Sequence, residues 1–280
     1  MIEQLVQQVA LLKFIERMTG WLNRIPVPYL QFPVRAHGCR LAAHTLDRYL
    51  ALWFWKLGLW ERTELKLLRG LGRPGMLVVD IGANIGFHTL ALAQQVGPQG
   101  HVWAFEPDPG NFAALQQNIH ANRAANVSAV NSAAGSTSGQ SYLYLSQAHH
   151  GDHRTYGSDA QRNAIPIQTV ALDQFFPTGQ RIDLIKMDIQ GAEGQALAGM
   201  QTLLKNNPGV IMLMEFWPMG LRQAGSSPEQ ILIDLQALGF TIEWIDQKSG
   251  TLRSAPEPKQ LAGALRGKQQ ANLVIRPASA

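Results

Sequence analysis

The chain has 280 residues, of which 46% are hydrophobic and 16% charged, a composition that excludes a disordered protein and fits a globular one with a sizeable core. Its formal net charge is +4, but no run of Lys or Arg forms a nucleic-acid stripe, so we expect no nucleic-acid partner. The single cysteine, Cys39, excludes an intramolecular disulfide, and no apolar run approaches the ~20 residues needed to cross a bilayer.

Residues 1–72 predict a mainly helical N-terminal extension. Apolar residues recur at helical spacing over residues 2–19, which predicts an amphipathic helix. The segment 49–60 is dense in aromatic residues. We interpret it as a helix packed against the following domain, and a homodimer or membrane-surface contact is the alternative. A lead-in helix is expected over residues 61–71.

Residues 73–277 predict one α/β domain. Strands are expected at 77–79, 101–105, 126–131, 182–187, 210–216, 240–245 and 272–275, and helices at 87–96, from 109, at 193–204 and at 231–238. This alternation is typical of a doubly wound, mostly parallel, seven-stranded Rossmann-like sheet. The last two strands should be antiparallel to each other. Residues 142–145 suggest part of a small hairpin insertion, residues 165–170 predict a further short strand, and residues 249–271 are interpreted as a polar excursion.

The first strand of this domain leads into a loop that suits a nucleoside. The apolar run 77–79 is followed by Asp80 and by a turn with Gly82 and Gly86, after which a helix begins. The glycines allow positive φ and close approach of the backbone to a ligand. The next strand ends in Glu106, about twenty residues beyond Gly86, where a carboxylate can accept both ribose hydroxyls.

The glycine spacing separates two classes of cofactor. Dinucleotide enzymes prefer Gly-x-Gly-x-x-Gly, which brings a pyrophosphate to the helix N-terminus. Here the middle glycine is missing, and Asp80 would repel a pyrophosphate but suits the ammonium group of a methionine moiety. The pattern therefore favours S-adenosylmethionine over NAD. The predicted cofactor-binding residues, including two that end the third strand where adenine would lie, are Asp80, Gly82, Ala83, Asn84, Gly86, His88, Glu106, Pro107, Asn131 and Ser132.

Three segments make the sequence similar to a known family. They read Val-Asp-Ile-Gly-Ala-Asn-Ile-Gly (79–86), Phe-Glu-Pro (105–107) and Ile-Lys-Met-Asp-Ile-Gln-Gly-Ala-Glu (185–193). Over residues 60–277 the chain resembles the FkbM family of S-adenosylmethionine-dependent methyltransferases. The resemblance implies O-methylation of a hydroxyl on a sugar, a glycolipid or polysaccharide, or a secondary metabolite. One departure is visible, because the family's third motif commonly reads Asp-x-Glu-Gly-x-Glu and Gln190 replaces its first glutamate.

Methyl transfer to a hydroxyl calls for a general base, which contributes about 10²–10⁴-fold to the rate. Ligands of such a sheet lie beyond the carboxyl ends of the strands, and Asp188 and Glu215 end two of them. His153 is the third candidate, from a polar segment at 146–164 that we interpret as a substrate loop.

The same loop supplies the predicted substrate contacts. Asp152 and Arg154 are candidates there, Arg154 for an anionic group, and Trp217 could form an apolar wall. A solvated loop without chemistry is one alternative. A metal site is another, but the spacing of His149, His150 and His153 matches no closed zinc pattern, so we expect no metal.

Three other functions stay open. The first is N-methylation of a small amine, which would need less help from a base. The second is a noncatalytic nucleoside-binding scaffold, which would have no reason to keep Asp80, Gly82, Gly86 and Glu106 together. The third is an NAD-dependent oxidoreductase, which is disfavoured because the turn lacks the middle glycine of the dinucleotide motif. The expected partners are a small-molecule or glycan acceptor and, through residues 49–60, a second copy of the chain. No secretory signal or stable membrane insertion is expected, so the predicted location is cytoplasmic.

Overall fold

The computed structural model describes most of the chain. The described ranges are 32–36, 39–43, 62–146, 153–157, 162–246, 251–267 and 269–278. The helix predicted at residues 2–19 and the aromatic segment 49–60 lie outside these ranges, as does Asp152. The predictions made for them therefore stay predictions.

A hairpin and a helix are described within the N-terminal extension. Strand β1 (Phe32–Ala36) pairs antiparallel with β2 (Cys39–Ala43), and α3 (Arg62–Leu71) leads into the large domain as predicted. The hairpin was not predicted, because Pro33 interrupts the sequence pattern there; proline is tolerated in an edge strand. The Asn122 side chain bonds both the N–H and the carbonyl of Arg40, at 2.8 and 2.6 Å, which fixes the hairpin to the large domain.

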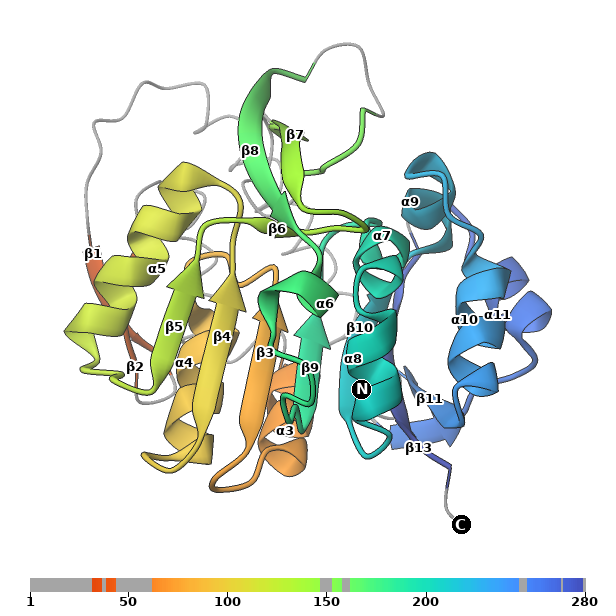
Figure 1. Cartoon of the computed structure of the whole chain (residues 1–280), viewed down its shortest axis with the longest axis horizontal. Helices are drawn as coiled ribbons and strands as arrows, with labels where there is room; N and C mark the ends of the chain where they lie inside the picture. Colours follow the sequence, from red (N-terminus) through yellow and green to blue (C-terminus); the bar gives the residue numbers. More distant parts are fainter. Residues whose placement is uncertain are drawn as a thin grey trace, which may run out of the picture.

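The large domain is built on a mixed eight-stranded sheet (Figure 1). Its strands are β3 (Leu77–Ile81), β4 (His101–Phe105), β5 (Val127–Val130), β9 (Leu184–Met187), β10 (Ile211–Phe216), β11 (Phe240–Asp246), β12 (Thr251–Ser254) and β13 (Ala271–Pro277). They lie in the order β12-β11-β13-β10-β9-β3-β4-β5, and β13 is antiparallel to both its neighbours. The chain runs outward from β3 to β5 and returns to β9 on the other side of β3. The carboxyl ends of β3 and β9 are therefore the switch point, where ligands of this fold bind.

The predicted doubly wound, mostly parallel sheet is confirmed, with one strand more than expected. Seven strands match the predicted segments, and β11 and β13 are antiparallel to each other as predicted. The interpretation of residues 249–271 as a polar excursion is wrong, because this segment forms β12 and α11 (Pro258–Ala264). Both are short, and the exposed residues of β12 show no alternation of apolar side chains.

Helices cover both faces of the sheet (Figure 1). On one face lie α3, α4 (Phe87–Val96) and α5 (Pro109–Ala121). On the other lie α6 (Leu172–Phe175), α7 (Glu193–Ala198), α8 (Gln201–Asn206), α10 (Pro228–Ala237) and α11, while α9 (Pro218–Gln223) follows β10. The single helix predicted over 193–204 is in fact two. It breaks at Gly199, whose position leaves no room for a side chain because a Cβ would lie 2.0 Å from the carbonyl oxygen of Gly135.

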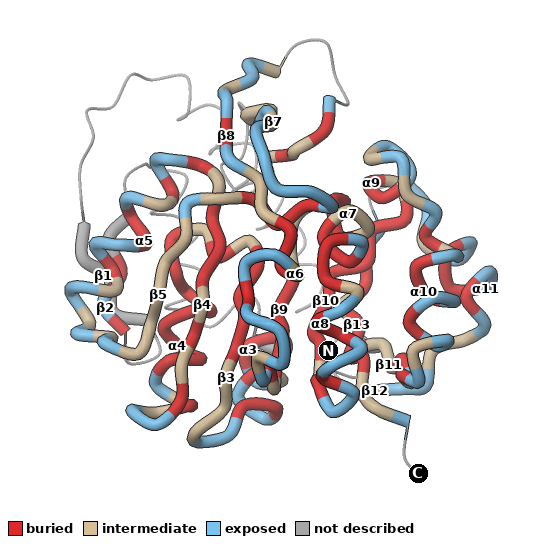
Figure 2. The backbone as a smooth tube through the Cα atoms, viewed as in Figure 1, coloured by how far each residue is buried: buried red, intermediate tan, exposed pale blue. Residues whose placement is uncertain are grey.

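Alternate residues of each central strand face opposite helical layers. Val79 and Ile81 pack into the core beneath α8 and α10, whereas Val78 packs towards α3 and α4. The central strands are buried on both sides, and β5 at the sheet edge is half-buried (Figure 2). By this alternation the side chains of Asp80 and Lys186 face the α3–α4 layer.

A small second sheet stands beyond the carboxyl ends of the central strands (Figure 1). It consists of β6 (Ala133–Ala134), β7 (Gly139–Tyr144) and β8 (Ala164–Val170), with β7 and β8 antiparallel. This is the hairpin insertion predicted from the sequence. Its position brings Leu143 and the segment 153–157 over the switch point, since Tyr144 bridges to Arg154.

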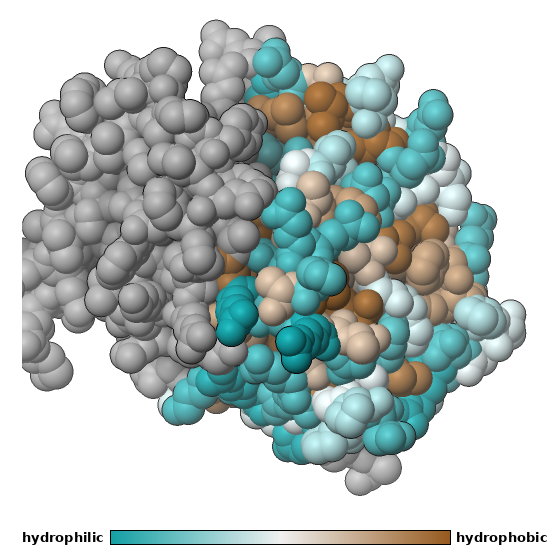
Figure 3. Space-filling view, turned by 90° about the vertical axis from the view of Figure 1, so that its left-hand side faces the viewer, coloured by the Kyte–Doolittle hydropathy of each residue, from teal (hydrophilic) through white to brown (hydrophobic). Residues whose placement is uncertain are grey.

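The helices of the described ranges do not include a membrane-spanning one. None of the helices within the described ranges has the length and apolar character needed to cross a bilayer. On the face shown in Figure 3, hydrophilic and hydrophobic residues are intermixed over the described surface.

Candidate functional site

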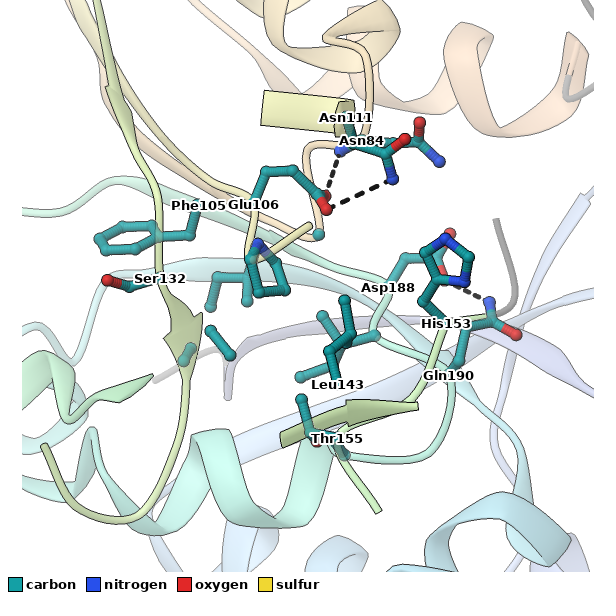
Figure 4. A pocket seen from close by; sticks show the side chains of 17 residues that line it. Asn84, Phe105, Glu106, Asn111, Ser132, Leu143, His153, Thr155, Asp188 and Gln190 are labelled. Carbon is teal, nitrogen blue, oxygen red and sulfur yellow. Dashed lines mark hydrogen bonds between the residues drawn. The ribbon is translucent and has the colours of Figure 1, made fainter. Parts of the chain in front are cut away.

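A pocket lies at the switch point, beyond the carboxyl ends of β3, β4 and β9. Figure 4 shows that its walls come from the ends of β3, β4 and β9 and from the insertion. Seven of the predicted site residues line it: Gly82, Asn84, Glu106, Pro107, Ser132, His153 and Asp188. The other lining residues are Ile81, Phe105, Asn111, Ala133, Ala134, Leu143, Thr155, Ile189, Gln190 and Ala192.

Glu106 directly follows the last residue of β4, so its side chain reaches the edge of the sheet and the pocket. Its carboxyl group accepts hydrogen bonds from the Asn84 N–H at 2.8 Å and the Asn111 amide at 3.4 Å (Figure 4). It also accepts from the Asp108 N–H at 3.0 Å. Burial raises the pKa of Glu106 to about 7, against the lowering effect of these donors. The site therefore holds a buried carboxyl group that changes charge near neutral pH.

The turn after β3 approaches β9 closely. Gly82 has φ 81°, and a Cβ there would lie 2.0 Å from the Asp188 carbonyl oxygen, so no other residue fits without a shift of the backbone. Asn84 also adopts a left-handed conformation, with φ 50°. Gly86, with φ 91°, begins α4 and packs against Leu115. Ala83 is buried beneath the turn and, like Gly86, is not part of the pocket wall.

Asp80 is not brought to the pocket. The strand continues to Ile81, so the Asp80 side chain points into the layer between the sheet and α4, where it is fully buried. Its Oδ2 accepts a 2.6 Å hydrogen bond from the Thr89 hydroxyl, and its Oδ1 lies 3.5 Å from Lys186 Nζ. Asp80 thus forms a buried ion pair with Lys186, and its contact with a methionine ammonium group stays a prediction.

His88 is likewise buried in α4 and does not line the pocket. Burial and then the nearby charge of Lys186 lower the pKa of His88 well below its usual value, so the ring is neutral. It packs edge-on against Phe87 at a centroid distance of 5.1 Å. The structure therefore places His88 in the core, and its role in binding the cofactor stays a prediction.

Of the two predicted site residues that follow β5, one lines the pocket and the other holds neighbouring strand ends together. Ser132 lines the pocket. The Asn131 amide donates to the carbonyl oxygens of Glu106 and Pro107, at 2.8 and 3.2 Å, and so joins the ends of β4 and β5. Asn131 supports the strand-end residues that face the pocket and does not face it itself.

Asp188 and Glu215 are linked by Gln190. Asp188 directly follows β9 and lines the pocket, whereas Glu215 lies within β10 and is 6% exposed. The Gln190 amide donates to both carboxyl groups, at 2.8 Å to Asp188 and 3.1 Å to Glu215. Burial, and then the charge of Asp188, raises the pKa of Glu215 well above its usual value. Of these two candidates for the base, Asp188 is the one at the pocket surface.

Glu193 closes the loop between β9 and α7. Its Oε1 accepts from the N–H groups of Ile189 and Gly191, at 3.1 and 3.3 Å, as expected of a carboxylate at a helix start. Its Oε2 is buried and has no hydrogen-bond partner among the described residues. Burial raises the pKa of Glu193 to about 7.

The change Glu193→Gln should make the stability of the protein less sensitive to pH. The pKa of Glu193 is raised by folding, so its contribution is favourable below its unfolded value and is lost as the pH rises through about 7. The variant keeps the Oε1 acceptor and cannot ionise. Between pH 5 and 8, the free energy of unfolding of the wild type should therefore fall by roughly 2–3 kcal/mol relative to that of the variant. Denaturant unfolding at several pH values measures this, and a constant difference would contradict it.

The segment 153–157 supplies one wall of the pocket. His153 lines it, with Nδ1 accepting from the Ser146 N–H at 3.0 Å and Nε2 3.9 Å from Asp108 Oδ2. Arg154 is 9% exposed and lies over the Trp217 ring at 4.7 Å. Trp217 donates its indole N–H to the Gly267 carbonyl at 2.9 Å. Arg154 and Trp217 thus pack together behind the pocket wall and do not line it.

Metal ligands were not expected from the sequence. Within the described ranges, no group of three or more His, Cys, Asp or Glu side chains is arranged to hold a metal ion. His149, His150 and Asp152 lie outside those ranges.

Comparison with known proteins identifies the family. The methyltransferase FkbM domain matches residues 80–242, more than half of the chain. The chain belongs to the FkbM methyltransferase family. The match begins at Asp80 and includes the whole of the predicted site from the first turn to Glu215.

Individual relatives of this FkbM methyltransferase are distant. Methyltransferase 1 of Beauveria bassiana is 26% identical over 44% of this chain and 57% of its own length. Methyltransferase sdnD of Sordaria araneosa is 27% identical over 59% of this chain and 73% of its own. A SAM-dependent methyltransferase of Aquifex aeolicus superposes with a TM-score of 0.45 and 14% identity, over 83% of this chain and 98% of that one. The chain spans little more than half the length of the first of these relatives.

The pocket of this FkbM methyltransferase fits S-adenosylmethionine. At the β4 end, the buried carboxyl group of Glu106 suits a ribose, and the apolar side chains of Phe105 and Pro107 beside it suit a base. At the β9 end, the wall is formed by Ile189 and Ala192 together with Asp188 and Gln190. Family and pocket agree on this cofactor.

Several residues that line the pocket were not predicted from the sequence. Asn111 belongs to the first turn of the helix after β4, and its distance of five residues from Glu106 was a usable signal. Gln190 was visible only as a departure from the family motif. Leu143 and Thr155 carry no local signal, because tertiary folding of the insertion brings them to the switch point.

Proposed function

We propose that this methyltransferase transfers a methyl group from S-adenosylmethionine to a hydroxyl oxygen of a sugar, a glycolipid or polysaccharide, or a secondary metabolite. The observation that carries the proposal is the pair of strand-end carboxyl groups, Glu106 and Asp188, at two ends of one pocket. Glu106 is assigned to the ribose. Asp188 is assigned to the proton of the acceptor hydroxyl.

S-adenosylmethionine supplies an electrophilic methyl group on a sulfonium, so the acceptor oxygen forms the new bond as the sulfur–carbon bond breaks. Positioning of the two reactants accounts for much of the acceleration in such reactions. Asp188 accepts the hydroxyl proton as general base. His153, which lines the same pocket, is the second candidate for this role.

The insertion excludes water from the pocket in this proposal. Leu143 and Thr155 line the pocket at the switch point (Figure 4). Leu143 is 2% exposed and packs in an apolar cluster with Ala133 and Ile167, so the wall that it forms is apolar. Residues 146–164 are the proposed substrate loop. The residues predicted from the sequence to bind the acceptor are Asp152 and Arg154 of this loop and Trp217, and this role stays a proposal.

Methyl transfer is tested with S-adenosylmethionine carrying an isotopically labelled methyl group and a panel of glycosides, polyketides and small amines. Label in a hydroxyl-derived ether supports the proposal. Label on nitrogen alone replaces it with the N-methyltransferase alternative. Binding of the cofactor without transfer to any acceptor favours a noncatalytic scaffold. The cytoplasmic location predicted from the sequence stays a proposal.

Cofactor affinity should depend on pH through Glu106. Burial raises the pKa of Glu106 to about 7, and only the ionised form accepts from both ribose hydroxyls. The dissociation constant of S-adenosylhomocysteine should therefore rise as the pH falls below about 7, by up to ~10-fold per pH unit. Calorimetric titration between pH 5.5 and 8.5 measures it. Glu106→Gln should bind more weakly without this dependence, and an equal dependence in both proteins would refute the assignment.

A further inference from the structure

Gln190 joins two carboxyl groups that belong to neighbouring strands. Its Nε2 donates to Asp188 Oδ1 at 2.8 Å and to Glu215 Oε2 at 3.1 Å (Figure 4 shows the first of these). Within the described part of the chain, neither carboxyl group accepts a side-chain or backbone hydrogen bond from another residue. The Gln190 amide is therefore what sets the orientation of both.

The backbone holds Gln190 in place for this contact. Gln190 has φ 55° and Gly191 has φ 102°, left-handed conformations that persist in a non-glycine residue only where the surroundings fix them. The Tyr156 hydroxyl donates to the Gln190 carbonyl oxygen at 2.8 Å. A hydrogen bond from the pocket-wall segment 153–157 thus helps to fix the position of the amide.

Charge and burial decide which carboxyl group holds a proton. Two carboxyl oxygens that share one donor nitrogen lie within the roughly 4–6 Å over which like charges disfavour joint ionisation. Glu215 is buried and faces Asp188, Glu193 of α7 and Glu64 of α3, while Lys186 of β9 opposes their effect only in part. These surroundings raise the pKa of Glu215, so it keeps its proton to a higher pH than an ordinary glutamate. Asp188, half-buried at the pocket surface, is left to act as an acceptor.

We propose that Gln190 is a positioning residue that tethers Asp188 to Glu215 and so holds Asp188 in the pocket as the proton acceptor. The catalytic part of this inference rests on the proposed function. A neutral amide suits the role because it donates to both groups and adds no charge. A glutamate at position 190, as in the motif Asp-x-Glu-Gly-x-Glu, would place a third carboxyl group beside the other two.

The kinetic test compares Gln190→Glu and Gln190→Met with the wild type. Gln190→Met removes the donor at similar volume and should lower kcat roughly 10–100-fold, with KM for S-adenosylmethionine little changed. Gln190→Glu should in addition move the acidic limb of the kcat–pH profile to higher pH, by about one unit. Gln195→Glu is the control, because it adds the same charge on α7 without lining the pocket. An unmoved limb in Gln190→Glu, or an equal shift in the control, would overturn the proposal.

A second measurement does not need an acceptor. Carbon-13 NMR of the labelled Glu215 carboxyl group should show a titration midpoint well above the usual range of a glutamate in the wild type. The midpoint should rise further in Gln190→Glu but not in Gln195→Glu. An ordinary, unshifted Glu215 in all three proteins would overturn the tether even in an active enzyme. If the titrations are as expected but the protein methylates no acceptor, the proposed function is overturned. The hydrogen-bonded link between Asp188, Gln190 and Glu215 is then still supported.

Discussion

Replacing Lys186 with Met should lower the free energy of unfolding by about 3–5 kcal/mol, the usual cost of leaving one member of a buried ion pair alone. Lys186 is 3% exposed and Asp80 is fully buried, with 3.5 Å between Nζ and Oδ1. Lys186 also donates to the Gly82 carbonyl at 3.2 Å, so the cofactor turn should loosen with it. Denaturant unfolding measures the loss, which is among the largest expected for a single substitution in this chain.

The control for this prediction is the double variant Asp80→Asn/Lys186→Met. It removes both charges and leaves a neutral amide that the Thr89 hydroxyl can still contact. Most of the lost stability should return, because the penalty comes from the uncompensated charge. Lys205→Met, on the outer side of α8, should change little. A single variant as stable as the wild type would mean that Asp80 and Lys186 are not an ion pair.

Asp188→Asn should lower kcat about 10²–10⁴-fold, the range that a general base contributes. The substitution preserves the shape of the side chain, and its amide oxygen can still accept from Gln190. The affinity for S-adenosylhomocysteine should therefore stay close to that of the wild type. Single-turnover methyl transfer together with calorimetric titration separates the two quantities.

Asp234→Asn is the matched control for Asp188→Asn, because Asp234 is exposed on α10 far from the pocket wall. It should keep full activity. If Asp188→Asn also keeps full activity, the base lies elsewhere, and His153→Ala is the next variant to measure. If Asp188→Asn loses cofactor affinity and activity in equal proportion, the role of Asp188 is binding and not proton transfer.

Acidic residues near strand ends were predictable from the sequence, but their directions were not. Glu106 and Asp188 come one residue after their strands and line the pocket. Asp80 and Glu215 lie inside their strands, so they face the layer beneath α3 and α4. A shift of one residue in a strand turns a side chain to the other face. Strand boundaries are the least certain part of a sequence-based prediction.

The fold was predictable where hydrophobic periodicity was strong. The helix at 87–96 and the strand at 101–105 have the bounds expected from their apolar runs. The hairpin of β1 and β2, the edge strand β12 and the short helix α11 are all too short to show a sustained apolar period, and Pro33 and two arginines interrupt the hairpin. They are stabilised by packing on a domain that is already formed, and such tertiary effects leave little local pattern.

The most direct test of the central assignment is calorimetric titration of the purified protein with S-adenosylhomocysteine and, separately, with NAD, repeated on Glu106→Ala. We expect the wild type to bind S-adenosylhomocysteine and not NAD, and Glu106→Ala, at the same Tm within a few degrees, to lose that binding. Binding of NAD alone would contradict the account. So would undiminished binding of S-adenosylhomocysteine by Glu106→Ala, because the pocket at the ends of β4 and β9 would then not be the cofactor site.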